Sequence, residues 1–223
     1  MAIVFLFLSL VLLYLSGRSL LFQLTHLVHR TGGSRRFLIV LWSLIFLPGT
    51  IIHELSHFFL AILVGARTGK IEIFPEFLDM DDEGGGVALG SVQTQKLNIM
   101  QGVLVGLAPF FVGLGLLVWL GSTILQSYSA ENYLSLIYQG YLFFTISNSF
   151  FPSRSDLVHV IPAAITTVIA IIIAWLVGVQ FSFSVSKTVA DIAQAIFLTL
   201  VVSALLNFVI SFLLYLTRRA IHR

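Results

Sequence analysis

Residues 37–64 read FLIVLWSLIFLPGTIIHELSHFFLAILV, a long apolar run interrupted by one polar cluster, HELSH, at residues 53–57. About 20 consecutive apolar residues cross the hydrocarbon core of a bilayer as a helix. The run therefore predicts a membrane-spanning helix with His53, Glu54 and His57 inside it. Each such side chain costs on the order of 2–3 kcal/mol in that position unless it is partnered. We expect these three residues to share a functional site.

The composition of the whole chain indicates the same environment. Hydrophobic residues make up 58% of the 223 residues and charged residues only 10%, whereas soluble domains usually carry about 25% charged residues. The sequence predicts an all-α polytopic membrane protein, integral and multi-pass, in a membrane of the cytoplasmic or plasma membrane type. A net charge of +2 does not indicate nucleic-acid binding, so the lipid bilayer is the expected surrounding partner. Because the chain has no cysteine, any metal must be held by histidines and carboxylates.

About six segments are long and apolar enough to be predicted transmembrane helices. They cover residues 2–24, 37–64, 97–120, 133–151, 157–179 and 189–216. The first segment lacks the positive n-region of a signal peptide, so we expect it to be retained as a span. The whole chain, residues 1–223, is predicted to form a single membrane domain. Basic residues between the spans favour cytoplasmic termini.

The connection at residues 65–96 differs from the others. Residues 70–74 alternate as a half-exposed strand does, and residues 87–92 are again typical of a strand. An acidic stretch and three glycines, at residues 84–86, separate them and favour a turn. We predict a small β-hairpin-like insertion at the membrane surface after the second span. A disordered acidic loop is the alternative.

The HELSH cluster has the spacing of a zinc site. In a helix, residues four apart lie on one face, so His53 and His57 can bind one Zn²⁺ while Glu54 acts as general base on water. A polar contact between helices, without metal, is the alternative. A catalytic zinc site needs a third protein ligand besides its water.

Asp156 is the expected third ligand. The second and fourth spans run in the same direction, so their C-terminal ends meet at one face of the membrane. Pro152 breaks the fourth helix and lets irregular backbone enter a protein-lined cavity just before Asp156. A surface-loop aspartate is the alternative, with His159, one turn further on, as a backup ligand. Asp191 is a weaker candidate, since it suits the first turn of a helix equally well.

Small residues recur in the third predicted span. Gly102, Gly106 and Gly113 lie on or near one helical face. Such residues let a neighbouring helix approach closely, so we expect them to serve helix packing.

Together these motifs resemble the site-2 protease family of intramembrane zinc metalloproteases, in a minimal form without a PDZ domain. The resemblance covers residues 47–156 in the family's order, inside a protease-like core at about residues 37–179. It is carried by His53-Glu54-Leu55-Ser56-His57-Phe58, Val64-Gly65-Ala66, Gly106-Leu107-Ala108-Pro109, and Asn148 with Pro152 and Asp156.

The resemblance implies roles for five residues. His53, His57 and Asp156 would be the zinc ligands and Glu54 the catalytic base. Asn148 would bind substrate, holding the unwound chain or its developing oxyanion. The loop at residues 65–96 would offer an edge strand to an extended peptide. One departure is Leu157, since the family usually has glycine after the aspartate.

We therefore predict a hydrolase of intramembrane proteolysis: a zinc-dependent endopeptidase that cleaves peptide bonds in or near transmembrane segments of membrane protein substrates. The alternative is a non-proteolytic, protease-like accessory or structural subunit of a larger membrane complex with partner membrane subunits. A transporter ranks third, because the predicted spans show no inverted repeat.

Overall fold

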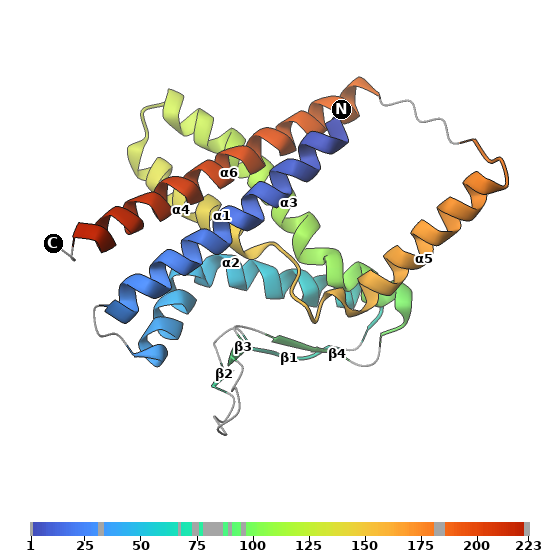
Figure 1. The fold of residues 1–223 in the computed structure, drawn as a ribbon, viewed down its shortest axis with the longest axis horizontal. Helices are drawn as coiled ribbons and strands as arrows, with labels where there is room; N and C mark the ends of the chain where they lie inside the picture. The colour runs from blue at the N-terminus through green and yellow to red at the C-terminus, as the bar shows by residue number, and fades with distance from the viewer. Residues whose placement is uncertain are drawn as a thin grey trace.

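A computed structural model of the chain describes residues 2–30, 34–66, 68–72, 76–77, 87–88, 91–94, 97–180 and 186–220. Most of these residues are helical (Figure 1). The helices are α1 (Ala2–Arg30), α2 (Arg35–Leu63), α3 (Ile99–Ser129), α4 (Tyr133–Ser149), α5 (Leu157–Leu176) and α6 (Lys187–Ala220). Five of them, all except α4, are long and apolar enough to cross a membrane. These helices indicate a multi-pass membrane protein, as predicted.

The expectation of about six spans is corrected at α4. This helix has 17 residues, which at 1.5 Å per residue make a rod of about 26 Å. The hydrocarbon core is about 30 Å thick, so α4 is shorter than this core and is not among the helices long and apolar enough to cross it. The predicted span at residues 133–151 was overestimated because Phe150 and Phe151 are apolar but lie beyond the end of the helix.

Local signals define where α2 ends and α3 begins. Gly65 follows α2 with a φ of +74°, a backbone conformation that glycine adopts without strain. Asn98 caps α3: its side chain accepts from the backbone N–H of Gln101 at 2.8 Å, while the Gln101 side chain accepts from the Asn98 N–H at 3.2 Å. The Gln101 amide also donates to the Val64 carbonyl at 2.9 Å. These bonds hold the end of α2 against the start of α3.

The buried core lies where α1, α3, α4 and α6 meet. Leu117 of α3 and Leu200 of α6 are fully buried at its centre. The other buried members of this cluster are Leu13, Leu120, Phe143, Ile146, Phe150 and Ala204. Phe150, in the link after α4, belongs to this core, so the packing of four helices also anchors the link that leads to Asp156.

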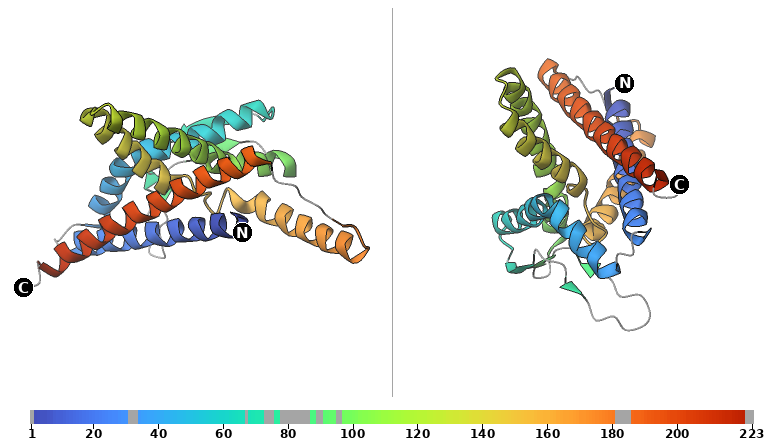
Figure 2. Two further views of the ribbon diagram at one scale, coloured as in Figure 1. Left: turned by 90° about the horizontal axis from the view of Figure 1, so that it is seen from above. Right: turned by 90° about the vertical axis from the view of Figure 1, so that its left-hand side faces the viewer.

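Helices α1 and α6 lie side by side and run in the same direction (Figures 1 and 2). The rings of Phe5 and Phe197 meet near their N-terminal ends, with centroids 6.0 Å apart. Further along both helices, Gly17 lies against Asn207. Two parallel neighbours that both cross a membrane place the two ends of the chain on opposite faces. The arrangement is therefore at odds with the expectation that both termini are cytoplasmic.

Short strands occupy the described parts of the connection between α2 and α3. They are β1 (Thr68–Glu72), β2 (Glu76–Phe77), β3 (Val87–Ala88) and β4 (Ser91–Thr94). β1 pairs with β4 and β2 with β3, both antiparallel. The predicted glycine turn at residues 84–86 and the acidic stretch before it lie outside the described residues. The single hairpin-like insertion therefore stays a prediction.

Helix α5 extends away from the other helices (Figures 1 and 2). None of its residues is buried within the described part of the chain. Its main contact within the described residues is with α3 and lies near its N-terminal end, where His159 and Val160, together with Asp156 just before the helix, lie against glycines of α3. The N-terminal end of α5 is thus held near the site residues.

Candidate metal centre

His53 and His57 project from one face of α2, and both rings are oriented by backbone carbonyls. The Nδ1 atom of His53 lies 2.7 Å from the carbonyl oxygen of Ser149, and the Nδ1 atom of His57 lies 2.8 Å from that of Val105. A carbonyl oxygen can only accept a hydrogen bond, so each Nδ1 carries the proton. The Nε2 lone pair of each neutral ring is then free. Orientation of this kind is typical of metal-ligating histidines.

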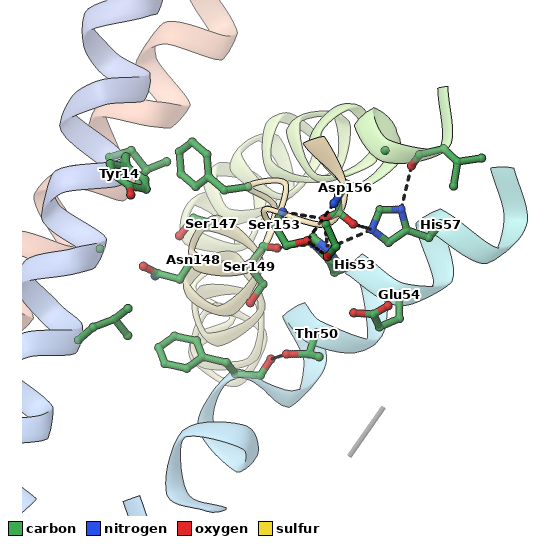
Figure 3. A pocket seen from close by; sticks show the side chains of 18 of the residues that line it. Tyr14, Thr50, His53, Glu54, His57, Ser147, Asn148, Ser149, Ser153 and Asp156 are labelled. Carbon is green, nitrogen blue, oxygen red and sulfur yellow. Dashed lines mark hydrogen bonds and ion pairs between the residues drawn. The ribbon is translucent and has the colours of Figure 1, made fainter. Parts of the chain in front are cut away.

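Asp156 completes a cluster with these two rings (Figure 3). Its Oδ2 lies 3.4 Å from Nε2 of His53, and its Oδ1 lies 3.2 Å from Nε2 of His57. The backbone N–H of Ser153 donates to Oδ2 at 2.6 Å and fixes the carboxylate. Asp156 reaches this position because α4 ends at Ser149 and Pro152 lies in the irregular link before α5.

The ionisation of Asp156 suits a metal ligand. Burial raises the pKa of this carboxyl, but the hydrogen bond from Ser153 and the attraction of a His53 or His57 ring that carries a second proton, on Nε2, outweigh burial and hold the pKa well below its usual range. Such a ring proton occupies the place that a bound cation would take. The residue is therefore a carboxylate, the form that binds a cation.

The spacing of the three residues fits one tetrahedral zinc ion. Nitrogen or oxygen donors bound tetrahedrally at about 2.0–2.1 Å lie about 3.3 Å from one another. The two Nε2 atoms are 3.2 Å apart, and each faces a different oxygen of the Asp156 carboxylate, His57 at 3.2 Å from Oδ1 and His53 at 3.4 Å from Oδ2. Acceptors facing one another at this range repel unless a cation or a proton lies between them. Residues His53, His57 and Asp156 thus form a possible metal-binding triad.

Glu54 lies beside this triad on α2 (Figure 3). It is 8% exposed, lines the same cavity, and makes no hydrogen bond or ion pair with any described residue. A carboxylate next to a metal site, with no partner of its own, is free to accept a proton from water.

Glycines of α3 make room for the segment that carries Asp156. A Cβ atom at Gly106 would overlap the carbonyl oxygen of Asp156, and one at Gly113 would overlap the Phe150 side chain. At Gly102 it would overlap the ring of His159. The small residues of the third span therefore serve packing, as expected, and the packing they allow places a candidate ligand.

The triad opens onto a cavity of about 810 Å³. Its walls come from α1, α2, the start of α3 and the end of α4 with the following link. Tyr14 and Arg18 line the side formed by α1, and Trp42, Phe46 and Thr50 line that formed by α2. The volume lies in the range of small-ligand sites, which are typically 300–1,000 Å³.

The other predicted site residues fall into two groups. Asn148 and His159 line the cavity, although His159 does not join the triad. Asp191, near the start of α6, does not line the cavity. Leu157 is the first residue of α5 and has no positive φ, so the position after Asp156 does not require glycine in this chain.

Three contributors to the site were not identified from the sequence. The carbonyls of Ser149 and Val105 orient the two rings, but every residue has a carbonyl, so no sequence signal marks them. Asn207 of α6 bonds to Asn148. An amide within an apolar helix was a signal that could have singled out Asn207.

Comparisons of the chain with protein-family models, with curated proteins and with solved structures found no match. Any functional assignment therefore depends on the residues of this chain and on the geometry just described.

Proposed function

We propose that the chain is an intramembrane zinc metalloprotease that hydrolyses peptide bonds in or near transmembrane segments of other proteins. One observation carries the proposal. The Nε2 atoms of His53 and His57 are 3.2 Å apart, and each lies 3.2 or 3.4 Å from an oxygen of the Asp156 carboxylate, close to the spacing of tetrahedral zinc ligands, with the unpartnered carboxylate of Glu54 beside them. This combination of ligands and base is typical of zinc hydrolases.

His53, His57 and Asp156 would hold the zinc, which when bound would supply a Lewis acid for the scissile carbonyl and would lower the pKa of water to about 7. Glu54 takes a proton from the attacking water as its oxygen bonds to the carbonyl carbon. The C–N bond then breaks, and the leaving amine receives the proton from Glu54. The carbonyls of Ser149 and Val105 keep the imidazoles in the tautomer that leaves Nε2 free.

The location of the site indicates the class of substrate. His53, Glu54 and His57 lie within α2, a helix that is long and apolar enough to cross a membrane. A peptide bond that reaches them must be in or near the bilayer. A helical substrate hides its amide groups in its own hydrogen bonds, so we expect the cleaved segment to be unwound in the cavity.

Glu54→Gln separates metal binding from catalysis. We expect the purified variant to keep about one zinc per chain, since Glu54 is not a ligand, and to lose about 10²- to 10⁴-fold in cleavage rate, the usual contribution of a general base. The assay follows hydrolysis of a labelled peptide of about 20 apolar residues in lipid nanodiscs. Metal content is measured by mass spectrometry.

Asp156→Ala and Asp191→Asn form a matched pair for the same assay. We expect Asp156→Ala to lose both zinc and cleavage, because it removes one of three protein ligands. Asp191→Asn changes a carboxylate that does not line the cavity and should keep both. Wild-type cleavage by Glu54→Gln, or full zinc in Asp156→Ala, would refute the proposed function.

One observation favours the second candidate function, an accessory subunit of a membrane complex. Helix α5 is apolar, has no buried residue within the described chain, and packs mainly against α3. A partner membrane subunit would cover it. This candidate predicts a stable complex during purification in mild detergent, together with zinc-loaded protein that cleaves no peptide.

A further inference from the structure

Asn207 is a polar residue in the apolar helix α6 and is completely buried. Its carboxamide pairs with that of Asn148 at the end of α4. The Nδ2 atom of Asn148 donates to Oδ1 of Asn207 at 2.9 Å, and Nδ2 of Asn207 donates to Oδ1 of Asn148 at 2.9 Å. Asn148 lines the cavity of the metal centre, whereas Asn207 lies behind it.

A backbone carbonyl determines which atom of the Asn148 amide is the nitrogen and which is the oxygen. Nδ2 of Asn148 also donates to the carbonyl oxygen of Phe144 at 2.9 Å. Because a carbonyl only accepts, the atom beside it must be the nitrogen. The orientation of Asn207 follows, since its own oxygen must face that nitrogen.

The pairing uses up the donors of Asn148. A carboxamide has two N–H groups and an oxygen with two lone pairs. Both N–H groups of Asn148 are engaged, one by Phe144 and one by Asn207, and one lone pair of Oδ1 is engaged by Asn207. What remains for a ligand in the cavity is the second lone pair of Oδ1.

Helix α1 passes the pair on a third side. A Cβ atom at Gly17 would lie 3.2 Å from Oδ1 of Asn148 and 3.8 Å from Nδ2 of Asn207. Glycine at this position therefore lets α1 come close without a side chain against the Asn148 oxygen. The hydrogen bonds of the pair and the burial of Asn207 keep the pattern of donors and acceptors fixed.

We propose that Asn207 is a positioning residue that, through its pair with Asn148, makes Asn148 a hydrogen-bond acceptor for a backbone N–H of the substrate. The inference rests on the proposed function and deepens it. An unwound substrate exposes backbone N–H groups, and the Asn148 oxygen, in the wall of the cavity that contains the triad, binds one of them. Asn148 in this state has no N–H to offer a developing oxyanion, in contrast to one role that the family resemblance implies.

The experiment measures peptide binding in the Glu54→Gln background, where the probe is not consumed. The probe is a labelled peptide of about 20 Leu and Ala residues in lipid nanodiscs, with each central amide N-methylated in turn. N-methylation replaces the N–H that Asn148 would bind. At one position we expect binding to weaken about 2- to 12-fold, the effect of one lost neutral hydrogen bond.

That loss should depend on both asparagines. The loss on N-methylation should disappear when Asn148→Ala or Asn207→Leu is added, because no oriented acceptor then remains. The variant that carries both Asn148→Ala and Asn207→Leu should bind the peptide no more weakly than Asn148→Ala alone. Asn207→Asp keeps an acceptor for the Asn148 amide and should retain the loss. Ser211→Ala removes a buried hydroxyl one turn away that has no partner among the described residues, and should also retain it.

The outcomes distinguish this inference from the proposed function. Absence of any sensitive position, or a sensitive position that persists in Asn207→Leu, would overturn the role of Asn207. If Asn207→Leu does not fold, Asn207→Ala, which also removes the amide but adds no bulk, makes the same comparison, and a sensitive position that persists in it would equally overturn the role of Asn207. Failure of zinc-loaded wild type to cleave would instead count against the protease, since binding is measured without turnover.

Discussion

Gly106→Ala tests how the third ligand is placed, without changing any ligand. Gly106 lies on α3 at the point where the backbone of Asp156 crosses it. An added Cβ would overlap the Asp156 carbonyl oxygen so closely that one of the two backbones must shift. Since both are main chain, no side-chain rotation relieves the overlap. We expect Asp156 to move away from His53 and His57.

The size of the effect follows from the geometry. Restoring ordinary van der Waals contact requires a shift of roughly 1 Å, whereas zinc–ligand distances tolerate about 0.2 Å. Loss of an orienting contact alone weakens metal binding about 10- to 100-fold, so we expect at least that loss of zinc affinity. Overpacking should also lower the free energy of unfolding by about 1–3 kcal/mol.

The assay is zinc affinity by competition with a chromophoric chelator, on protein purified in detergent. Gly115→Ala is the matched control, because a Cβ at that position of α3 meets nothing within 4 Å. It should leave zinc affinity unchanged and leave stability equal or higher, since alanine is the better helix former by about 1 kcal/mol. Wild-type zinc affinity in Gly106→Ala would refute the view that close packing on α3 positions Asp156.

Two further predictions follow from neighbouring contacts. In Gly49→Ala the new Cβ would overlap the backbone carbonyl oxygen of Thr145, so α4 must move from α2 and the bond from His53 to the Ser149 carbonyl should weaken. Thermal unfolding should show a loss of about 1–3 kcal/mol, and Gly140→Ala, which meets open space, should show none. Zinc at 100 times its dissociation constant should stabilise the wild type by about 2.7 kcal/mol. No such stabilisation is expected in Asp156→Ala, and its presence there would contradict the assigned ligand set.

Features that depend on short stretches of chain were predictable from the sequence. The apolar runs located α1 to α6 because a bilayer imposes a length and a composition on each helix. The spacing of His53 and His57 placed them on one face because that depends only on helical periodicity. Asp156 could be proposed as the third residue of the cluster because the direction of successive spans determines which helix ends lie at the same face of the membrane.

Features that depend on how helices pack were not predictable. The shortness of α4 was hidden by apolar residues beyond its end. The parallel course of α1 and α6 follows from contacts far apart in the chain, such as Phe5 with Phe197. The pairing of Asn148 with Asn207 likewise joins residues of different helices, and nothing in the pattern of either helix names the other.

The chemistry of the site shows the same division. The amino-acid sequence by itself determined a histidine pair with a neighbouring carboxylate inside an apolar helix, since those residues are neighbours on that helix. Only the tertiary structure decided that both Nε2 atoms face Asp156 at ligand spacing. The physical reason is that the Ser149 and Val105 carbonyls orient the rings and the α3 glycines admit Asp156, and these contacts exist only once the helices have packed.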